Sequence, residues 1–219
     1  MTLKSKMQFE EYLKTLFGEI IKLHSKFELY LHLQNERVDR LNEMNLAPAF
    51  FKLTMDALIS DVIISLAKIY ENYRSERSNR NLNKFLRFVE NNLDLFPQSI
   101  EEMKLLNCNY LVDYDLIKTH LEQIDNQKEV LDNLFQWRDK LYAHFDKKYF
   151  ADREKLNVDH SINIGQIRTL IQLAGEILNK YSVAYNGVYK TIEAVNLKDV
   201  DTIFNILHRH LESFKEEHN

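Results

Sequence analysis

The chain contains only four glycines and two prolines in 219 residues, and this scarcity constrains its fold more than any other feature. Turns depend on both residues, because glycine adopts positive φ without strain and proline fixes φ and ends helices. A β-sandwich or an α/β protein needs many turns and normally uses more of both residues. Hydrophobic residues make up 45% of the chain, which is enough for a packed core. We therefore expect an all-α fold of long helices.

Hydrophobic residues recur at helical spacing along most of the chain. The predicted helices cover residues 7–44, 50–73, 82–95, 116–145, 163–185 and 199–214. The second of them is apolar on most of its surface, which predicts a central, covered position. Short connections between long helices favour an up-and-down bundle of about five to seven helices. No repeat or linker divides the sequence, so we expect residues 1–219 to form a single domain.

Several polar residues at predicted helix ends have side chains that suit a cap. Ser99 lies three residues before Glu102, and Asn163 three residues before Gln166, which is the spacing of a capping box. Asp199 is the predicted cap of the last helix, and Asn186-Gly187 is a turn signal after residues 163–185.

The net charge of −4 gives the whole molecule no attraction for nucleic acid. One segment of 14 residues departs from this average, because it holds five basic residues and only one acid, Glu76. The basic residues are Arg74, Arg77, Arg80, Lys84 and Arg87. Two interpretations remain open: a solvated loop with the start of a helix, or a patch that faces phosphate or a partner.

The sequence offers no sign of a membrane or secreted protein. It has no stretch near the ~18 apolar residues of a membrane span and no apolar signal-peptide segment after Lys4 and Lys6. A single cysteine, Cys108, excludes an internal disulfide framework. We expect a cytoplasmic protein that does not contact membranes. A glycine-rich phosphate loop is also absent from the sequence, which argues against ATP or GTP hydrolysis of the P-loop type.

The predicted helix over residues 116–145 carries the most unusual pattern, two neighbouring stripes that are apolar or aromatic except at Arg138 and His144. The stripes are Val130, Leu134, Trp137, Leu141 and His144, and Leu131, Phe135, Arg138, Tyr142 and Phe145. A cation in an apolar setting needs a partner, because burying an unpaired charge is costly. Asp139 and Asp146 are nearby acids on one side of the helix. The alternative is ordinary: cations are favoured at helix C-termini by the macrodipole.

The segment from Trp137 to Lys148 resembles the signature of HEPN domains, in which an arginine and a polar residue precede a histidine near the end of a long helix. Here Arg138 and His144 are separated by five residues, a spacer within the range of the family's motif, and Asp139 fills the polar position. The sequence pattern Arg-Asp-Lys followed by Ala-His-x-Asp is most similar to that of the abortive-infection U branch of HEPN proteins. The specific motif covers about 11 residues, while the remaining resemblance is the all-helical pattern.

The resemblance implies metal-independent RNA cleavage by a homodimer, without a cofactor. In that picture His144 is a general acid or base at the ribose 2′-hydroxyl, because an imidazole titrates near neutral pH. Arg138 stabilises the charge that develops on the scissile phosphate, and Asp139 holds Arg138 or His144 in place. The expected products carry a 2′,3′-cyclic phosphate and a 5′-hydroxyl.

Further residues are candidates for RNA binding or for support of the site. The candidate RNA-binding residues are Lys140, Lys147, Lys148, Arg74, Arg77 and Arg80. The candidate supporting residues are Asp146, Tyr142 and Asp61. Asp61, like Asp56, lies on the apolar second helix, where it either pairs with Arg138 or faces solvent.

Helix geometry gives partial support for a dimer. In a continuous α-helix, positions six apart point roughly 120° away from each other, so Arg138 and His144 converge poorly on one phosphate. Two such helices paired across a two-fold axis would bring four basic groups together. The alternative is a helix that breaks near Ala143, with the two residues serving separate purposes.

The function expected from these residues is a toxin or antiphage defence effector, with RNA as substrate. An antitoxin encoded nearby is a candidate partner. Some HEPN toxins carry a tyrosine two positions after the motif histidine that a partner nucleotidyltransferase modifies; here that position is Asp146, so this inactivation is not implied. The alternative function is a non-catalytic HEPN-like dimer that binds nucleotide, RNA or a partner protein. Elsewhere, we expect His120 and Cys108 to be packed in the core rather than to take part in chemistry.

Overall fold

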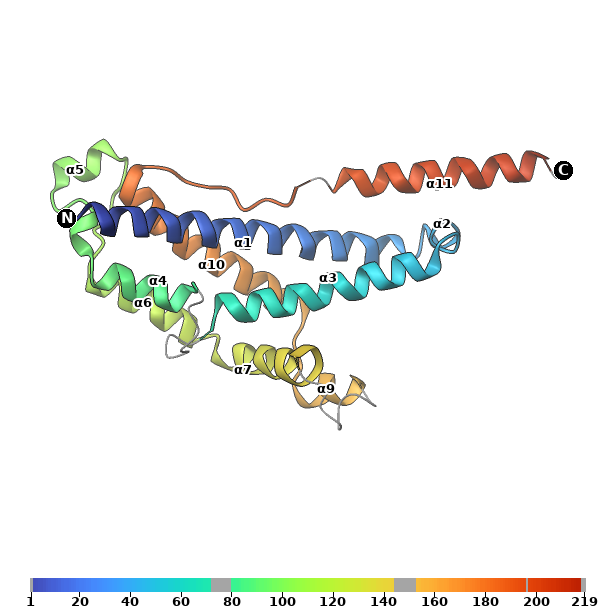
Figure 1. Cartoon of the computed structure of the whole chain (residues 1–219), viewed down its shortest axis with the longest axis horizontal. Helices are drawn as coiled ribbons and strands as arrows, with labels where there is room; N and C mark the ends of the chain where they lie inside the picture. Colours follow the sequence, from blue (N-terminus) through green and yellow to red (C-terminus); the bar gives the residue numbers. More distant parts are fainter. Residues whose placement is uncertain (1, 72–79, 144–152, 196, 218–219) are drawn as a thin grey trace. The chain divides into compact units, whose positions relative to one another are not determined.

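The computed structural model describes residues 2–71, 80–143, 153–195 and 197–217, with the side chains of these residues except 141–143, 153 and 215–217. Every regular element in these ranges is a helix, so the expected all-α fold is confirmed (Figure 1). The chain forms two compact units, Met1–Ile20 with Ile63–Ile192, and Ile21–Val62 with Glu193–Asn219. The helices α1 (Leu3–Glu36) and α3 (Pro48–Ile69) each contribute to both units. The expectation of a single domain stays a prediction.

The first unit is built around the long helix α10, which is surrounded by the ends of α1 and α3 and by shorter helices. These are α4 (Leu82–Glu90), the 3-10 turn η1 (Leu93–Leu95), α5 (Ile100–Leu105), α6 (Tyr114–Asp125), α7 (Lys128–Trp137), the π-helical turn η2 (Arg138–Ala143) and α9 (Arg153–Asp159), while α10 itself spans Ile164–Asn186. Asn163 and Gln166 form the predicted capping box at the start of α10. Gly187 ends the helix with φ of 72°, as the turn signal predicted.

Aromatic rings fill the core of this unit. Phe9 of α1 contacts Phe85 of α4 with ring centroids 5.8 Å apart, and Tyr185 of α10 with centroids 4.7 Å apart. Tyr181 packs edge-on against Phe85 at 5.4 Å. The hydroxyl of Tyr70, just after α3, donates to the backbone oxygen of Leu170 at 2.6 Å. These contacts join α1, α3, α4 and α10, and the residues Phe9, Leu13, Leu16 and Ile20, which recur at helical spacing on α1, are buried.

The second unit has its own small core. It contains the second half of α1, α2 (Leu41–Met44), the first half of α3 and α11 (Lys198–Glu217). Phe204 of α11 stacks on Phe51 with ring centroids 5.5 Å apart, beside Leu33 and Met44. Polar contacts hold the same helices: His32 contacts Asp201 at 2.7 Å, and His208 contacts Glu43 at 2.8 Å.

Several predicted boundaries were wrong. The helix expected over residues 7–44 ends at Glu36 and is followed by the separate α2; the apolar repeat fails between them, where Val38 is exposed. The helix expected over residues 116–145 is divided, as far as Ala143, into two α-helices and a π-helical turn, because the chain turns at Asn126 and Gln127. Pro48 is the first residue of α3, a position that needs no backbone donor.

The predicted caps were right in part. Ser99 accepts a hydrogen bond from the Glu102 backbone, but the Glu102 carboxylate accepts from the backbone of Gln98. Asp199 lies inside the first turn of α11, where its charge still suits the helix N-terminus. Among the described residues, no helix is both long enough and apolar enough to cross a membrane.

Candidate active site

The motif begins where α7 ends. α7 ends at Trp137, and the six residues Arg138–Ala143 continue as a π-helical turn. A π turn replaces the i→i+4 hydrogen bonds of an α-helix by i→i+5 bonds, and such turns occur frequently at functional sites. The motif therefore occupies a local backbone geometry that differs from the helix before it. The sequence pattern did not predict this change.

Arg138 is held on several sides. Its Nε donates to Oδ1 of Asp139 at 2.6 Å, and its Nη1 lies 3.9 Å from Oε1 of Glu71. The guanidinium also lies over the ring of Phe135, 5.1 Å from the centroid. The Arg138 side chain is 21% exposed. It is therefore fixed in orientation but still reachable from solvent, and the expected pairing of Asp139 with Arg138 is present.

Glu71 is a residue of the site that the sequence analysis missed. It follows the end of α3, and its backbone is fixed because the Nδ2 atom of Asn83 donates to the carbonyl oxygens of Tyr70 and Glu71, at 3.2 and 3.1 Å. The Glu71 side chain is 14% exposed. No local motif marks this residue, since it reaches Arg138 only through the fold.

His160, after α9, is a second residue that sequence reasoning missed. Its carbonyl oxygen accepts a hydrogen bond from Nε1 of Trp137 at 2.7 Å, and its Nε2 lies 3.4 Å from Nζ of Lys140. The same segment is tied to α7 by Asn133, whose amide donates to the carbonyl oxygen of Ser161 at 2.9 Å. A further imidazole therefore lies beside the motif, adjacent to Lys140.

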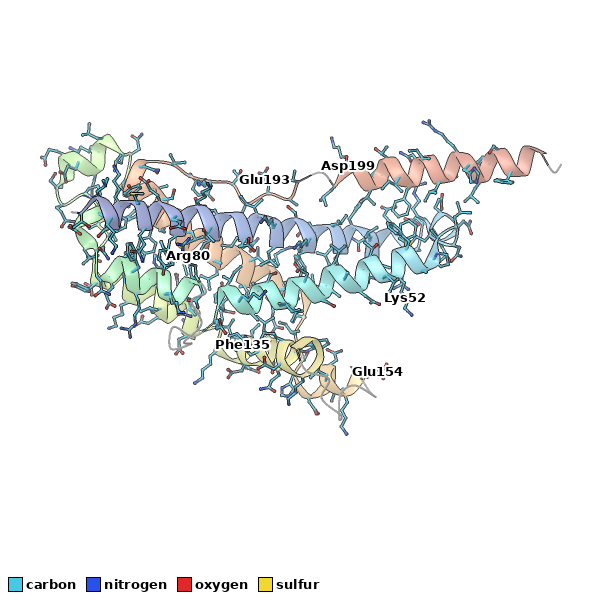
Figure 2. All side chains as sticks on the ribbon, in the orientation of Figure 1. Lys52, Arg80, Phe135, Glu154, Glu193 and Asp199 are labelled. Atoms are coloured by element: carbon cyan, nitrogen blue, oxygen red, sulfur yellow. The ribbon has the colours of Figure 1, made fainter. Side chains whose placement is uncertain are left out.

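Arg80 is held by α1. Its guanidinium contacts Glu11 at 2.6 Å and Thr15 at 3.3 Å and lies over the ring of Tyr12, 5.4 Å from the centroid (Figure 2). The hydrogen bond from Arg80 lowers the pKa of the Glu11 carboxyl. These contacts give Arg80 a structural role within the first unit. Its proposed role in RNA binding stays a prediction.

Asp61, the candidate supporting acid, belongs to the second unit. Its carboxylate accepts a hydrogen bond from Nζ of Lys26 at 2.6 Å. The acid that contacts Arg138 from the segment after α3 is Glu71.

The other candidates lie wholly or partly outside the described residues. His144, Asp146, Lys147, Lys148, Arg74 and Arg77 are outside these ranges. The backbone of Tyr142 belongs to the π-helical turn, but its side chain is not described. The roles assigned to these residues stay predictions. Where the chain is described, no group of three His, Cys, Asp or Glu side chains has the arrangement of a metal site.

His120 and Cys108 are buried, as expected. Nδ1 of His120 lies 2.8 Å from the hydroxyl of Tyr181, which joins α6 to α10. Burial lowers the pKa of His120 to about 4, and the nearby charge of Lys180 acts in the same direction. The Cys108 thiol donates to the carbonyl oxygen of Tyr110 at 3.2 Å.

Comparison with known proteins identifies the family. The family model HEPN_AbiU2, described as AbiU2, matches residues 6–203. Neither a curated protein nor a solved structure matches the chain. The matched range covers most of the chain and contains the Arg138 to His144 motif. The all-α fold, the motif and the family match together show that this chain belongs to the HEPN AbiU2 family of abortive-infection proteins.

Proposed function

We propose that this protein is a metal-independent endoribonuclease of HEPN type, a toxin or antiphage defence effector that cleaves RNA through a 2′,3′-cyclic phosphate. Membership of an abortive-infection family supports the defence context. The observation that carries the catalytic proposal is the environment of Arg138. A guanidinium fixed by Asp139 and by the Phe135 ring, and still 21% exposed, is preorganised to bind an anion.

The proposed reaction is an internal transesterification. The ribose 2′-oxygen loses its proton to a base and attacks the neighbouring phosphorus, the bond from phosphorus to the 5′-oxygen breaks, and the leaving 5′-oxygen takes up a proton. His144 is the proposed general acid or base. Arg138 stabilises the extra negative charge on the phosphate oxygens, since its planar fork donates two parallel hydrogen bonds. Asp139 positions Arg138. The reaction needs neither a metal nor a cofactor.

The proposed enzyme works as a homodimer, so that two copies of the motif meet at one site. Family resemblance supports this assembly. The angle of roughly 120° between positions six apart applies to a continuous α-helix, and residues Arg138–Ala143 are π-helical. Helix geometry therefore no longer supports the dimer independently. The proposed partners are RNA as substrate and an antitoxin encoded nearby.

An RNA cleavage assay in EDTA tests the proposal. Wild-type protein is incubated with total RNA and with tRNA, beside Arg138→Gln, His144→Ala and the control Lys118→Gln. Lys118 is an exposed cation on α6, so its replacement removes one positive charge at a position outside the motif. Removal of one preorganised transition-state donor typically lowers kcat about 100-fold or more, so both motif variants should lose cleavage while Lys118→Gln retains it.

The result is interpreted with circular dichroism spectra that confirm equal helix content in all four proteins. Cyclic-phosphate ends in the wild-type and Lys118→Gln reactions alone would support the assignment. Equal cleavage by wild type and His144→Ala would exclude the proposed role of His144.

A second candidate function is a non-catalytic dimer that binds nucleotide, RNA or a partner protein. The pairing of Arg138 with both Asp139 and Glu71 favours it, because two carboxylates around one guanidinium reduce its attraction for phosphate. The net charge of −4 acts in the same direction. A stable homodimer that cleaves no RNA and is not toxic on expression would support this candidate.

A further inference from the structure

A pocket of about 230 Å³ lies in the first unit beside α7, the helix that ends just before the motif. Its lining comes from α6 and α7, together with Tyr70 after α3 and Asn83 of α4. The volume is below the range of about 300–1,000 Å³ that is usual for drug-sized ligands. The pocket is therefore suited to a single ring system rather than to a whole nucleotide.

The walls of this pocket are apolar and aromatic. Ile124 of α6 and Leu131 of α7 are 6% and 7% exposed, and the ring of Phe135 lies next along α7 (Figure 2). Aromatic rings beside apolar side chains are typical of sites where an unstacked nucleobase is held.

The rim of the pocket is polar and charged. Lys128 and Asp132 lie four residues apart on α7 and so on one helix face, and Asp125, the last residue of α6, lines the same pocket. All three side chains are exposed. Within the described part of the chain, these three side chains form no ion pair and no side-chain hydrogen bond. The rim thus offers one donor group and two acceptor groups to a ligand.

The pocket and the candidate active site share Phe135. The guanidinium of Arg138 lies 5.1 Å from the centroid of the same ring that lines the pocket. Tyr70, in the pocket, is followed directly by Glu71, which contacts Arg138. A base in the pocket would consequently belong to a nucleotide next to the phosphate that Arg138 binds.

We propose that this pocket binds a guanine base of single-stranded RNA beside the scissile phosphate and so sets the sequence preference of the enzyme. The role of the pocket in cleavage preference rests on the proposed ribonuclease function, but binding of the base can be measured without cleavage. Asp132, assisted by Asp125, accepts hydrogen bonds from the N1–H and N2–H₂ groups of guanine. Lys128 donates to the guanine O6.

Hydrogen-bond chemistry selects guanine among the four bases. Its Watson–Crick edge presents an acceptor and then two adjacent donors, which complements an ammonium beside a carboxylate. Uracil presents two carbonyl acceptors on either side of one donor, so a carboxylate would face at least one oxygen. Cytosine and adenine each present a single amino donor on this edge. We therefore expect the pocket to bind guanine more tightly than each of the other three bases.

The test uses pentanucleotides with 2′-O-methyl groups, whose blocked 2′-oxygens cannot attack the phosphate. Fluorescence anisotropy measures the Kd of the full chain for labelled UUGUU and UUUUU. One good bidentate contact to a base discriminates by about tenfold or more, so wild type should bind UUGUU about ten times more tightly. Asp132→Asn should reduce this ratio below about threefold, because the amide presents a donor to one of the guanine donors. Glu129→Gln, also exposed on α7 but outside the pocket, should retain the wild-type ratio.

Equal binding of both oligonucleotides by wild type, or no binding of either, would overturn the proposal. A guanine preference that survives Asp132→Asn would also overturn it, since the preference would come from another site. The proposed ribonuclease function fails separately. If natural RNA is not cleaved but the guanine preference depends on Asp132, the guanine pocket is supported and the catalytic proposal fails. If RNA is cleaved but wild type shows no guanine preference, the catalytic proposal is supported and the guanine pocket fails.

Discussion

Replacing His120 should change the pH dependence of stability in a calculable way. His120 is 4% exposed, contacts Tyr181 across the core, and its pKa is lowered from 6.5 to about 4, chiefly by burial. The folded state therefore keeps this imidazole neutral at a pH where the unfolded state binds a proton. Protonation favours unfolding, so the stabilising contribution is complete above pH 6.5 and is lost as the pH falls towards 4.

The magnitude follows from the two pKa values. Each pH unit between them lowers the free energy of unfolding by about 1.4 kcal/mol. At pH 5.0 the loss is about 2 kcal/mol, and it levels off at about 3 kcal/mol below pH 4. Other groups also titrate in this range, but they titrate in a His120→Gln variant as well. Their contributions therefore cancel when the free energies of unfolding of wild type and variant are subtracted. Glutamine can still form a hydrogen bond with Tyr181 and does not titrate.

Urea unfolding of wild type and His120→Gln, followed by circular dichroism at pH 7.5 and pH 5.0, measures this difference. We expect the stability advantage of wild type over the variant to decrease by about 2 kcal/mol between the two pH values. Parallel pH dependence in the two proteins would refute the reasoning, because it would show that His120 protonates equally readily in the folded and unfolded states.

Two further predictions concern backbone strain and the second core. Gly187→Ala should destabilise the protein by about 1–2 kcal/mol, because φ is 72° and the new Cβ would lie 3.2 Å from the Leu106 carbonyl oxygen. Gly18→Ala, in the middle of α1 with open space around its Cβ, should instead stabilise by about 0.5–1 kcal/mol in the same urea experiment. Phe204→Ala should remove hydrogen-exchange protection from α11 while α10 stays protected, since Phe204 is 1% exposed and stacks on Phe51. Ile206 is 60% exposed on the same helix, so Ile206→Ala should leave the hydrogen-exchange protection of both α11 and α10 unchanged. Loss of protection in α10 with Phe204→Ala would contradict the division into two units.

The sequence predicts the features of this fold that depend on local spacing. Phe9, Leu13 and Ile20 recur at helical intervals, and all three are buried along α1. The capping box of α10 needs only Asn163 and Gln166, three residues apart, so it is also visible in the sequence. Such signals arise because helix formation and capping involve neighbours within one or two turns.

Features that depend on contacts between distant segments could not be predicted. The helical spacing of apolar residues on either side of residues 126–127 and along 138–143 indicates neither that the chain turns at 126–127 nor that a π-helical turn begins at Arg138. The contacts of Arg138 with Glu71 and of Arg80 with Glu11 join segments that are far apart in the sequence, and no spacing rule marks them. The candidate site was therefore predicted at Arg138 and Asp139, while Glu71 and the pocket beside Phe135 required the structure.

We propose that Arg138 and His144 make this HEPN protein a metal-independent ribonuclease. The most direct test is cleavage of total RNA and tRNA in EDTA by wild type and His144→Ala, with the new ends identified chemically. The proposed mechanism predicts 2′,3′-cyclic phosphate and 5′-hydroxyl ends with wild type and about 100-fold slower cleavage, or none, with the variant. Equal cleavage by both proteins, or cleavage that leaves other ends, would contradict it.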